Sequence, residues 1–151
     1  MTNKHIPTGF HTATPYLMVP DGAGAVEFCK RAFGAREIHC MADPGGRIRH
    51  AELRIDDSPI MLGEYADVEP RQPPKFPRLS IYLYVADADA VFASAIAAGA
   101  KQIHPMGDKF YGNREGGVED PFGIVWWIAT MMEELSPEEV EKRAAAMMAK
   151  A

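Results

Sequence analysis

Apolar and polar residues follow one another in an order that occurs twice along the chain. Each copy begins with an apolar segment, Ala13 to Val19 (ATPYLMV) in the first and Leu79 to Val85 (LSIYLYV) in the second. An Asp stands two residues after each segment, and apolar residues then recur at three- and four-residue spacings. This pattern predicts an extended strand followed by an amphipathic helix that the Asp caps. Gly34 and Gly99 stand where a glycine would end each helix.

The two copies also match residue by residue. The segment Val19 to Met41 returns as Val85 to Met106, with an offset of 66 residues before the helix and 65 after it. After the helix the identical pairs are Gly34/Gly99, Ala35/Ala100, Ile38/Ile103, His39/His104 and Met41/Met106. The recurrence of His39 as His104 indicates an inherited structural position more than a catalytic one.

Three further strands are expected after each helix, because short apolar stretches there are bounded by turn residues. The expected strands run from Arg36 to Met41, Arg47 to Ile55 and Pro59 to Gly63 in the first half, and from Lys101 to Met106, roughly Phe110 to Val118, and Ile124 to Thr130 in the second. The fold class is therefore α+β, built from a β-α-β-β-β unit that occurs twice.

These elements predict one domain of two halves and a helical tail. Unit one spans about 11–66 and unit two about 79–130, because the segment 67–78 between them is rich in proline, with four in the ten residues EPRQPPKFPR. A further helix is expected over 136–150, where Ser136 precedes a proline and two glutamates. Its apolar stripe is expected to pack on the body of the protein or on a second subunit.

Composition and charge narrow the classes of partner. The chain has 151 residues, 47% of them hydrophobic, and a net charge of −5 from 16 basic and 21 acidic side chains. It contains no Lys/Arg-rich run, so neither nucleic acid nor a membrane surface is an expected partner. Cys29 and Cys40 fit free thiols in a reducing compartment, and we expect a cytoplasmic protein.

The tandem units, with the turn Asp120-Pro121-Phe122-Gly123 before the last strand, resemble the vicinal oxygen chelate superfamily of glyoxalases, bleomycin-resistance proteins and extradiol dioxygenases. The segments TPYLMV, VEFCKRAFGA, GRIRHAELRI, KFYGNREGGVEDPFG and WWIAT are similar to its PhnB-like branch. The resemblance runs from about His11 to Arg143. It implies a curved sheet from each unit, with the helix outside and a cleft inside. It does not imply one reaction, because this fold hosts many chemistries.

The resemblance also implies a metal site with one ligand on the first and last strand of each unit. Those positions hold residues that are poor ligands for a divalent ion, namely Thr14, about Met61, Ser80 and Trp127. We therefore expect no cofactor and no metal, although a divalent ion that uses other residues stays an alternative.

Strand alternation predicts which side chains face the cleft. If Ala51, Leu53 and Ile55 face the helix, then Ile48 and the polar residues of the same strand face the cleft. The expected ligand-binding residues are Tyr16, Arg54, Tyr82, Tyr84 and Trp127, with His50 and Glu52 as a candidate catalytic acid–base pair. The alternative is that the aromatic residues fill the interior or an interface and that His50 and Glu52 form only an ion pair or hydrogen bond.

The loop from Phe110 to Arg114 adds two candidate ligand-binding residues. Tyr111 and Arg114 are either ligand contacts or parts of a structural turn, with Arg114 bound to Glu115 or Glu119. Where the PhnB-like branch usually has Asp and His, this chain has Asn113 and Met131. If the usual pair takes part in chemistry, this chain has lost it.

Three functions follow from these observations. The first is a metal-free protein of the bleomycin-resistance type that binds a small organic molecule in an aromatic cleft. The second is a glyoxalase-like lyase or isomerase that uses a divalent metal or the His50/Glu52 pair. The third is a homodimeric interaction module without catalysis. The resemblance makes a homodimer the expected assembly in each case.

Overall fold

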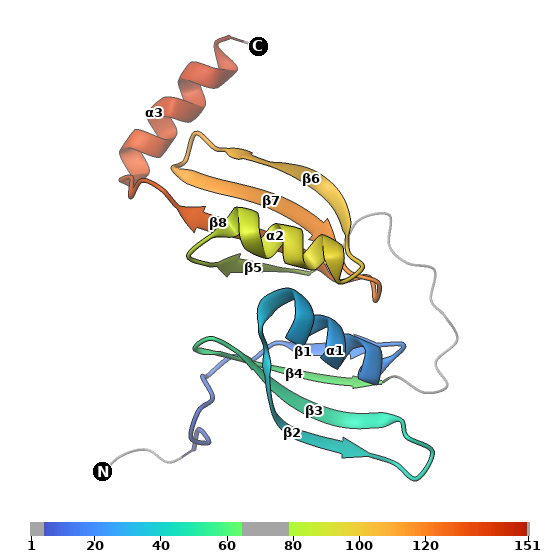
Figure 1. Cartoon of the computed structure of the whole chain (residues 1–151). Helices are drawn as coiled ribbons and strands as arrows, with labels where there is room; N and C mark the ends of the chain where they lie inside the picture. The colour runs from blue at the N-terminus through green and yellow to red at the C-terminus, as the bar shows by residue number, and fades with distance from the viewer. Residues whose placement is uncertain (1–4, 65–78, 151) are drawn as a thin grey trace. The chain divides into compact units, whose positions relative to one another are not determined.

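The computed structural model of the chain describes residues 5–64 and 79–150 (Figure 1). The chain divides into two compact units, one formed by residues 1–76 with 121–123 and the other by residues 77–120 with 124–151. The expected linker, 67–78, lies outside the described residues. Among the helices that the structure describes, none is long and apolar enough to cross a membrane.

Unit 1 is a four-stranded mixed sheet with one helix. Its elements in chain order are β1 (Tyr16–Val19), α1 (Gly22–Phe33), β2 (Arg36–Ala42), β3 (Ile48–Ile55) and β4 (Ser58–Glu64). The strand order is β1-β4-β3-β2, in which β1 is parallel to β4 and the other pairs are antiparallel. The helix contacts β2, β3 and β4 from one face of the sheet (Figure 1).

Unit 2 repeats this arrangement. Its elements in chain order are β5 (Ser80–Tyr84), α2 (Ala88–Ala97), β6 (Lys101–Asp108), β7 (Asn113–Glu119), β8 (Val125–Met131) and α3 (Pro137–Met148). The strand order β5-β8-β7-β6 corresponds strand by strand to that of unit 1. The prediction of an α+β fold with two β-α-β-β-β units and a C-terminal helix is confirmed.

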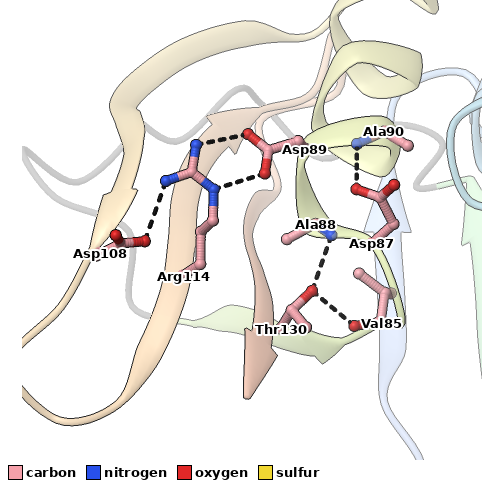
Figure 2. Close-up of polar contacts among 8 residues, drawn as sticks. All are labelled: Val85, Asp87, Ala88, Asp89, Ala90, Asp108, Arg114 and Thr130. Atoms are coloured by element: carbon pink, nitrogen blue, oxygen red, sulfur yellow. Dashed lines mark hydrogen bonds and ion pairs between the residues drawn. The ribbon is translucent and has the colours of Figure 1, made fainter. Parts of the chain in front are cut away.

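The helices begin where the sequence predicts caps. Asp21 Oδ1 accepts a hydrogen bond from the Gly24 amide at 2.9 Å, and Asp87 Oδ1 accepts one from the Ala90 amide at 3.0 Å (Figure 2). Gly34 ends α1 in the left-handed region, with φ at 66°. In α2 the C-cap is Ala98, and Gly99 follows it with φ at 111°.

The core of each unit lies between the helix and the sheet. In unit 1 the strand residues turned to the helix are almost fully buried, including Leu17, Val19, Ala51, Leu53 and Leu62. In unit 2 the corresponding residues are Val118, Trp126 and Ile128. Burial of each of the large apolar side chains contributes about 1.5–3 kcal/mol, so this layer holds each helix on its sheet.

Ile48 differs from its predicted orientation. Its side chain faces α1, since a Cβ placed on Gly22 would lie 2.6 Å from Ile48 Cβ. The cause is a register shift: Met41 pairs with His50 while Ala42 pairs with Ile48, which leaves Arg49 as an extra residue in β3. The bulge reverses the alternation before His50, so the prediction that Ile48 faces the cleft was wrong.

One strand and the C-terminal helix also bear on the expectations from the sequence. The strand predicted from Phe110 begins only at Asn113, because residues 109–112 form a turn in which Gly112 has φ at 94°. The helix α3 has no fully buried residue, although Val140 and Ala144 of its apolar stripe are half-buried, so packing of the stripe on the body or on a second subunit stays a prediction. Arg143 of this helix is held by Glu133, Glu139 and the Phe110 carbonyl oxygen.

Candidate functional site

Most of the side chains predicted to bind a ligand lie on the sheet face opposite the helix, which we call the open face of each unit. On β1 the exposed residues Tyr16 and Met18 alternate with buried residues that face α1. On β5 the same alternation leaves Tyr82 41% and Tyr84 67% exposed. The period of two along a strand therefore places these rings on the open faces, as the sequence predicts.

The open face of unit 1 brings Tyr16, His50 and Glu52 together. The Tyr16 hydroxyl lies 3.1 Å from His50 Nδ1, and His50 Nε2 lies 3.2 Å from Glu52 Oε1. The His39 ring stands with its centroid 6.4 Å from that of His50. If His50 donates its Nε2 proton to Glu52, its Nδ1 accepts the Tyr16 hydroxyl proton, so the three groups form a continuous hydrogen-bond chain.

Arg54, the third polar residue predicted for this face, is held by the chain itself. Its Nη2 donates a hydrogen bond to the carbonyl oxygen of Gly9 at 2.6 Å. The guanidinium thus ties β3 to the segment before β1. A role of Arg54 in binding a ligand stays a prediction.

The open face of unit 2 carries a cluster that the sequence analysis identified only in part. We call it the tyrosine cluster: Tyr82, Tyr84, Tyr111, Asn113 and Glu115. Glu115 is 3% exposed, and its two carboxylate oxygens accept one hydrogen bond each, from the Tyr82 and Tyr111 hydroxyls. Asn113 Nδ2 donates to the Tyr82 hydroxyl at 2.9 Å and to the Tyr84 hydroxyl at 3.5 Å. The rings of Tyr82 and Tyr84 lie 5.1 Å apart.

Both tyrosines that donate to Glu115 are poor acids. Burial raises the pKa of Tyr82 and Tyr111 far above the ordinary value of about 10, and the hydrogen bond to the Glu115 carboxylate raises each pKa further. Both phenols therefore remain protonated at neutral pH and act as donors to a carboxylate.

His50 and Glu115 occupy the same place in the two units. In the strand register of unit 1, Tyr16 of β1 lies opposite Met61 of β4, and Met61 lies opposite Glu52 of β3. In unit 2, Tyr82 of β5 lies opposite Trp127 of β8, and Trp127 lies opposite Gly117 of β7. His50 stands two residues before Glu52, and Glu115 stands two residues before Gly117. In each unit a tyrosine hydroxyl from the first strand therefore meets a titratable group at this place, an imidazole in unit 1 and a carboxylate in unit 2.

Asn113 and Glu115 are the residues of this site that the sequence analysis missed. From the sequence, Glu115 was expected only as an ion-pair partner of Arg114. The signal was nevertheless present, since the 65-residue offset of the repeat carries His50 onto Glu115. Alternation back from Gly117, which pairs with Trp127, gives the same face.

Trp127 also lies on the open face of unit 2, where its ring stacks on His104 with centroids 4.8 Å apart. Gly117 lies beside this stack: a Cβ there would stand 3.1 Å from Trp127 Cζ3 and 3.3 Å from His104 Cδ2. The absence of a side chain at Gly117 thus lets the two rings stack.

Arg114 lies on the other face of the same sheet, beside α2 (Figure 2). Its Nε and Nη2 donate to the two carboxylate oxygens of Asp89 at 2.6 and 2.8 Å, and its Nη1 donates to Asp108 at 3.1 Å. The guanidinium lowers the pKa of Asp89. The expected alternative partners, Glu115 and Glu119, were wrong, and Arg114 does not join the tyrosine cluster.

A cavity of about 220 Å³ opens next to the tyrosine cluster at the start of β7. It is lined by Asp108, Lys109, Gly112, Asn113, Met132 and Glu133. Asn113 belongs to both the cavity and the cluster. The volume is below the roughly 300–1,000 Å³ of pockets for drug-sized ligands, so it suits a small substituent of a ligand.

The four positions at which the resemblance places metal ligands do not fit a divalent ion. Met61 and Trp127 supply a thioether and an indole, and Ser80 a neutral hydroxyl. Thr14 lies before β1 begins. Within residues 5–64 and 79–150, no group of three or more His, Cys, Asp or Glu side chains is placed to hold a metal ion.

Comparisons with known proteins support the fold. The chain is 35% identical over 136 residues to the uncharacterized protein Rv0887c of Mycobacterium tuberculosis, with 85% of this chain and 79% of that protein covered. Among solved structures it is similar to TioX from Micromonospora sp. ML1, with 25% identity, a TM-score of 0.61 and coverage of 79% of this chain and 98% of TioX.

A gene product of Arabidopsis thaliana is similar at 26% identity and a TM-score of 0.59, with 80% of this chain and 98% of that chain covered. The fosfomycin resistance protein FosX from Listeria monocytogenes shares the fold at 16% identity and a TM-score of 0.60, with coverage of 86% and 97%. The sequence model described as the Glyoxalase/Bleomycin resistance protein/Dioxygenase superfamily matches residues 9–128. The chain therefore belongs to the glyoxalase/bleomycin resistance protein/dioxygenase superfamily.

Proposed function

We propose that this protein binds a small organic molecule on the open face of unit 2, without a resident metal. The observation that carries the proposal is the tyrosine cluster. Its polar atoms are bound to one another around Glu115, while the rings of Tyr82 and Tyr84 are left exposed. Fixed, exposed aromatic rings beside a few convergent polar groups are typical of ligand sites. The cavity that shares Asn113 adds room for a substituent.

A ligand-observed NMR screen of aromatic fragments tests this proposal. The library should contain neutral, cationic and anionic members. We expect saturable binding with chemical-shift changes in β5 and β7, and a loss of roughly tenfold in affinity in Tyr84→Ala, since base-like stacking on one ring contributes about 1–3 kcal/mol. Leu79→Ala is the matched control, because it removes an exposed apolar side chain just before β5. Absence of saturable binding, or equal binding by Tyr84→Ala, would contradict the proposal.

The metal-free part of the proposal has its own measurement. Elemental analysis of protein purified without chelator should find less than stoichiometric divalent metal, and fragment binding should be the same with and without EDTA. This expectation rests on the poor donors at Met61, Ser80 and Trp127. One tightly bound divalent ion per chain would overturn it.

A second candidate function is proton transfer by the open face of unit 1. It is favoured by the chain of contacts from Tyr16 through His50 to Glu52, because a carboxylate that orients an imidazole is an arrangement used in general acid–base catalysis. Deuterium exchange into a simple α-hydroxyketone in D₂O, followed by NMR, would detect such an activity. If it operates, His50→Gln should lower the protein-dependent rate by about 10²–10⁴-fold, and Arg31→Gln, on the exposed surface of α1, should not.

We also propose that the chain pairs with a second copy of itself. The support is two pairs of exposed methionines, Met131 and Met132 at the end of β8 and Met147 and Met148 at the end of α3. Exposed apolar side chains that gather into a patch mark interfaces, and each pair is a candidate contact for a second copy. Sedimentation equilibrium should give twice the mass of one chain, and a truncation that removes α3 should weaken the dimer; a monomer at all concentrations would refute it.

A further inference from the structure

We propose that the ligand of the tyrosine cluster is an organic cation, a quaternary or protonated amine carried on an apolar body. This inference rests on the proposed function and names the chemical class of its ligand. Three observations support it: a buried carboxylate with no cationic partner among the described residues, exposed aromatic rings beside it, and a cluster with a single free donor for an anion.

The first observation concerns Glu115. At 3% exposure its carboxylate is largely removed from water, and a buried carboxylate is normally stabilised by a cation. In the part of the chain that the structure describes, Glu115 accepts two phenol hydrogen bonds and forms no ion pair. The adjacent residue, Arg114, points to the other face of the sheet and is bound to Asp89 and Asp108. Within the described residues, the charge of Glu115 is thus not matched by a cation of the chain.

The second observation concerns the tyrosine rings next to this carboxylate. Tyr82 and Tyr84 lie 5.1 Å apart with planes inclined by 45°, so together they form an open corner with two aromatic faces. A phenol that donates its proton to a carboxylate has a more electron-rich ring, which increases the attraction of the ring face for a cation. Tyr84 is 67% exposed, so a ligand reaches its ring directly.

The third observation concerns the donors of the cluster. Tyr82 and Tyr111 donate their hydroxyl protons to Glu115, and Asn113 donates to the hydroxyls of Tyr82 and Tyr84. Only the Tyr84 hydroxyl proton has no acceptor among the contacts of the cluster. Within the cluster an anion would face the Glu115 charge with one donor to bind it, whereas a cation needs no donor. The adjacent cavity adds the ammonium group of Lys109, but it sets two carboxylates, Asp108 and Glu133, beside it.

Unit 1 provides an internal contrast. At the place of Glu115 it has His50, which is already paired with Tyr16 and Glu52. The preference for a cation should therefore depend on residues of unit 2 alone, and Tyr16→Leu should leave it unchanged.

The test compares three probes of similar shape: phenyltrimethylammonium, its neutral isostere tert-butylbenzene, and the anion 4-tert-butylbenzoate. Affinities are measured by NMR titration of the full chain. We expect the cation to bind roughly tenfold or more tightly than the neutral isostere, and the anion to bind most weakly. Glu115→Gln should abolish the preference for the cation while the neutral probe still binds. Glu119→Gln, an exposed carboxylate at the end of the same strand, should preserve it.

Two variants of Tyr84 test the preference for a cation even if Glu115→Gln fails to fold. Tyr84→Leu should weaken binding of the cation by roughly fivefold or more, and Tyr84→Phe should retain it, because only the first removes the aromatic ring. Equal binding of the cation and its neutral isostere, or tighter binding of the anion, would overturn the inference while leaving the proposed function intact. If none of the three probes nor any screened fragment binds, the proposed function itself fails.

Discussion

The two units have the same strand order and register but carry different chemistry on their open faces. In unit 1 the hydroxyl of Tyr16 meets an imidazole that contacts a second acid, Glu52. In unit 2 the hydroxyl of Tyr82 meets a buried carboxylate, and Gly117 stands where unit 1 has that second acid. The fold thus fixes where a tyrosine meets a titratable group, whereas the identity of that group decides between proton transfer and attraction of a cation.

The helix-facing sides of the two sheets differ as well. Ala51 of β3 is fully buried under α1, and Gly116 takes its place in β7. A Cβ on Gly116 would stand 2.8 Å from Phe92 Cε2 and 2.7 Å from Met106 Sδ. Phe92 stands five residues after the Asp that caps α2, where α1 has Val26. The larger side chain on the helix in unit 2 is accommodated by the smaller residue on the strand.

The largest effect on stability should come from removing both donors to Glu115. Tyr82→Phe with Tyr111→Phe leaves a buried carboxylate without its hydrogen bonds, so we expect the free energy of unfolding to fall by about 1.5–3 kcal/mol. Tyr16→Phe in unit 1 should cost less than about 1 kcal/mol, because its hydrogen bond to His50 is exposed and joins groups that water can serve instead.

Urea unfolding followed by NMR signals of each unit measures these changes. Tyr84→Phe is the control, since its hydroxyl lies 3.5 Å from Asn113 and makes no contact with Glu115. If Tyr16→Phe lowers the free energy of unfolding as much as the double variant does, the buried carboxylate of Glu115 does not make the hydrogen bonds of unit 2 stronger than those of unit 1.

A smaller effect should follow from Gly116→Ala, which places in unit 2 the residue that unit 1 already has. The added methyl group displaces Phe92 and Met106, and we expect a loss of about 1–2 kcal/mol, toward the lower end for overpacking because the Met106 side chain can move. Phe92→Val should recover part of this loss, so the two changes should couple in a double-mutant cycle. Gly107→Ala, with no atom within 4 Å of the new Cβ, should be nearly neutral. Additive effects would argue against the size compensation.

Much of the fold could be predicted from the sequence because the hydrophobic pattern occurs twice along the chain. The order of elements, the caps at Asp21 and Asp87, and the strand faces of Tyr16, Tyr82 and Tyr84 follow from periodicity and repeat. The bulge at Arg49 was not accessible, since nothing in the sequence marks the extra residue. The buried state of Glu115 was missed for a different reason: charged residues are rarely placed in a core from sequence alone.

The partners of Arg114 could not be predicted from the sequence. Its neighbours in sequence, Glu115 and Glu119, suggested local ion pairs, but alternation turns it to the helix side of the sheet, where Asp89 enters from α2 (Figure 2). Part of this arrangement repeats in unit 1, because Arg49 pairs with Asp43 at 3.1 Å as Arg114 pairs with Asp108 at 3.1 Å. The position of Asp89 is taken by Ala23 in unit 1, whose side chain cannot form an ion pair, so among the described ion pairs the arginine is tied to its helix in unit 2 alone.

The smallest expected effect is a pH-dependent change in stability on replacing Arg114, which replacing Arg49 should not cause. Arg114 holds the pKa of Asp89 below its usual value, so the ionised carboxylate is favoured in the folded state. The resulting stability is present above about pH 4, the ordinary range of an Asp, and disappears as the pH falls through the lowered pKa of Asp89. Arg114→Gln should therefore slightly destabilise unit 2 at neutral pH and match the parent protein in acid, and added salt should reduce the difference.

Carboxyl ¹³C titration of Asp89 and amide exchange in the first turn of α2 measure this prediction. In Arg114→Gln the Asp89 pKa should rise and the amides of Ala88 to Ala90 should exchange faster. Arg49→Gln is the matched control: it removes the repeated strand contact but touches no helix, so exchange at the start of α1 should not change. If both variants loosen their helices equally, the arginine acts through the sheet in each unit, and the Asp89 contact is not what separates them.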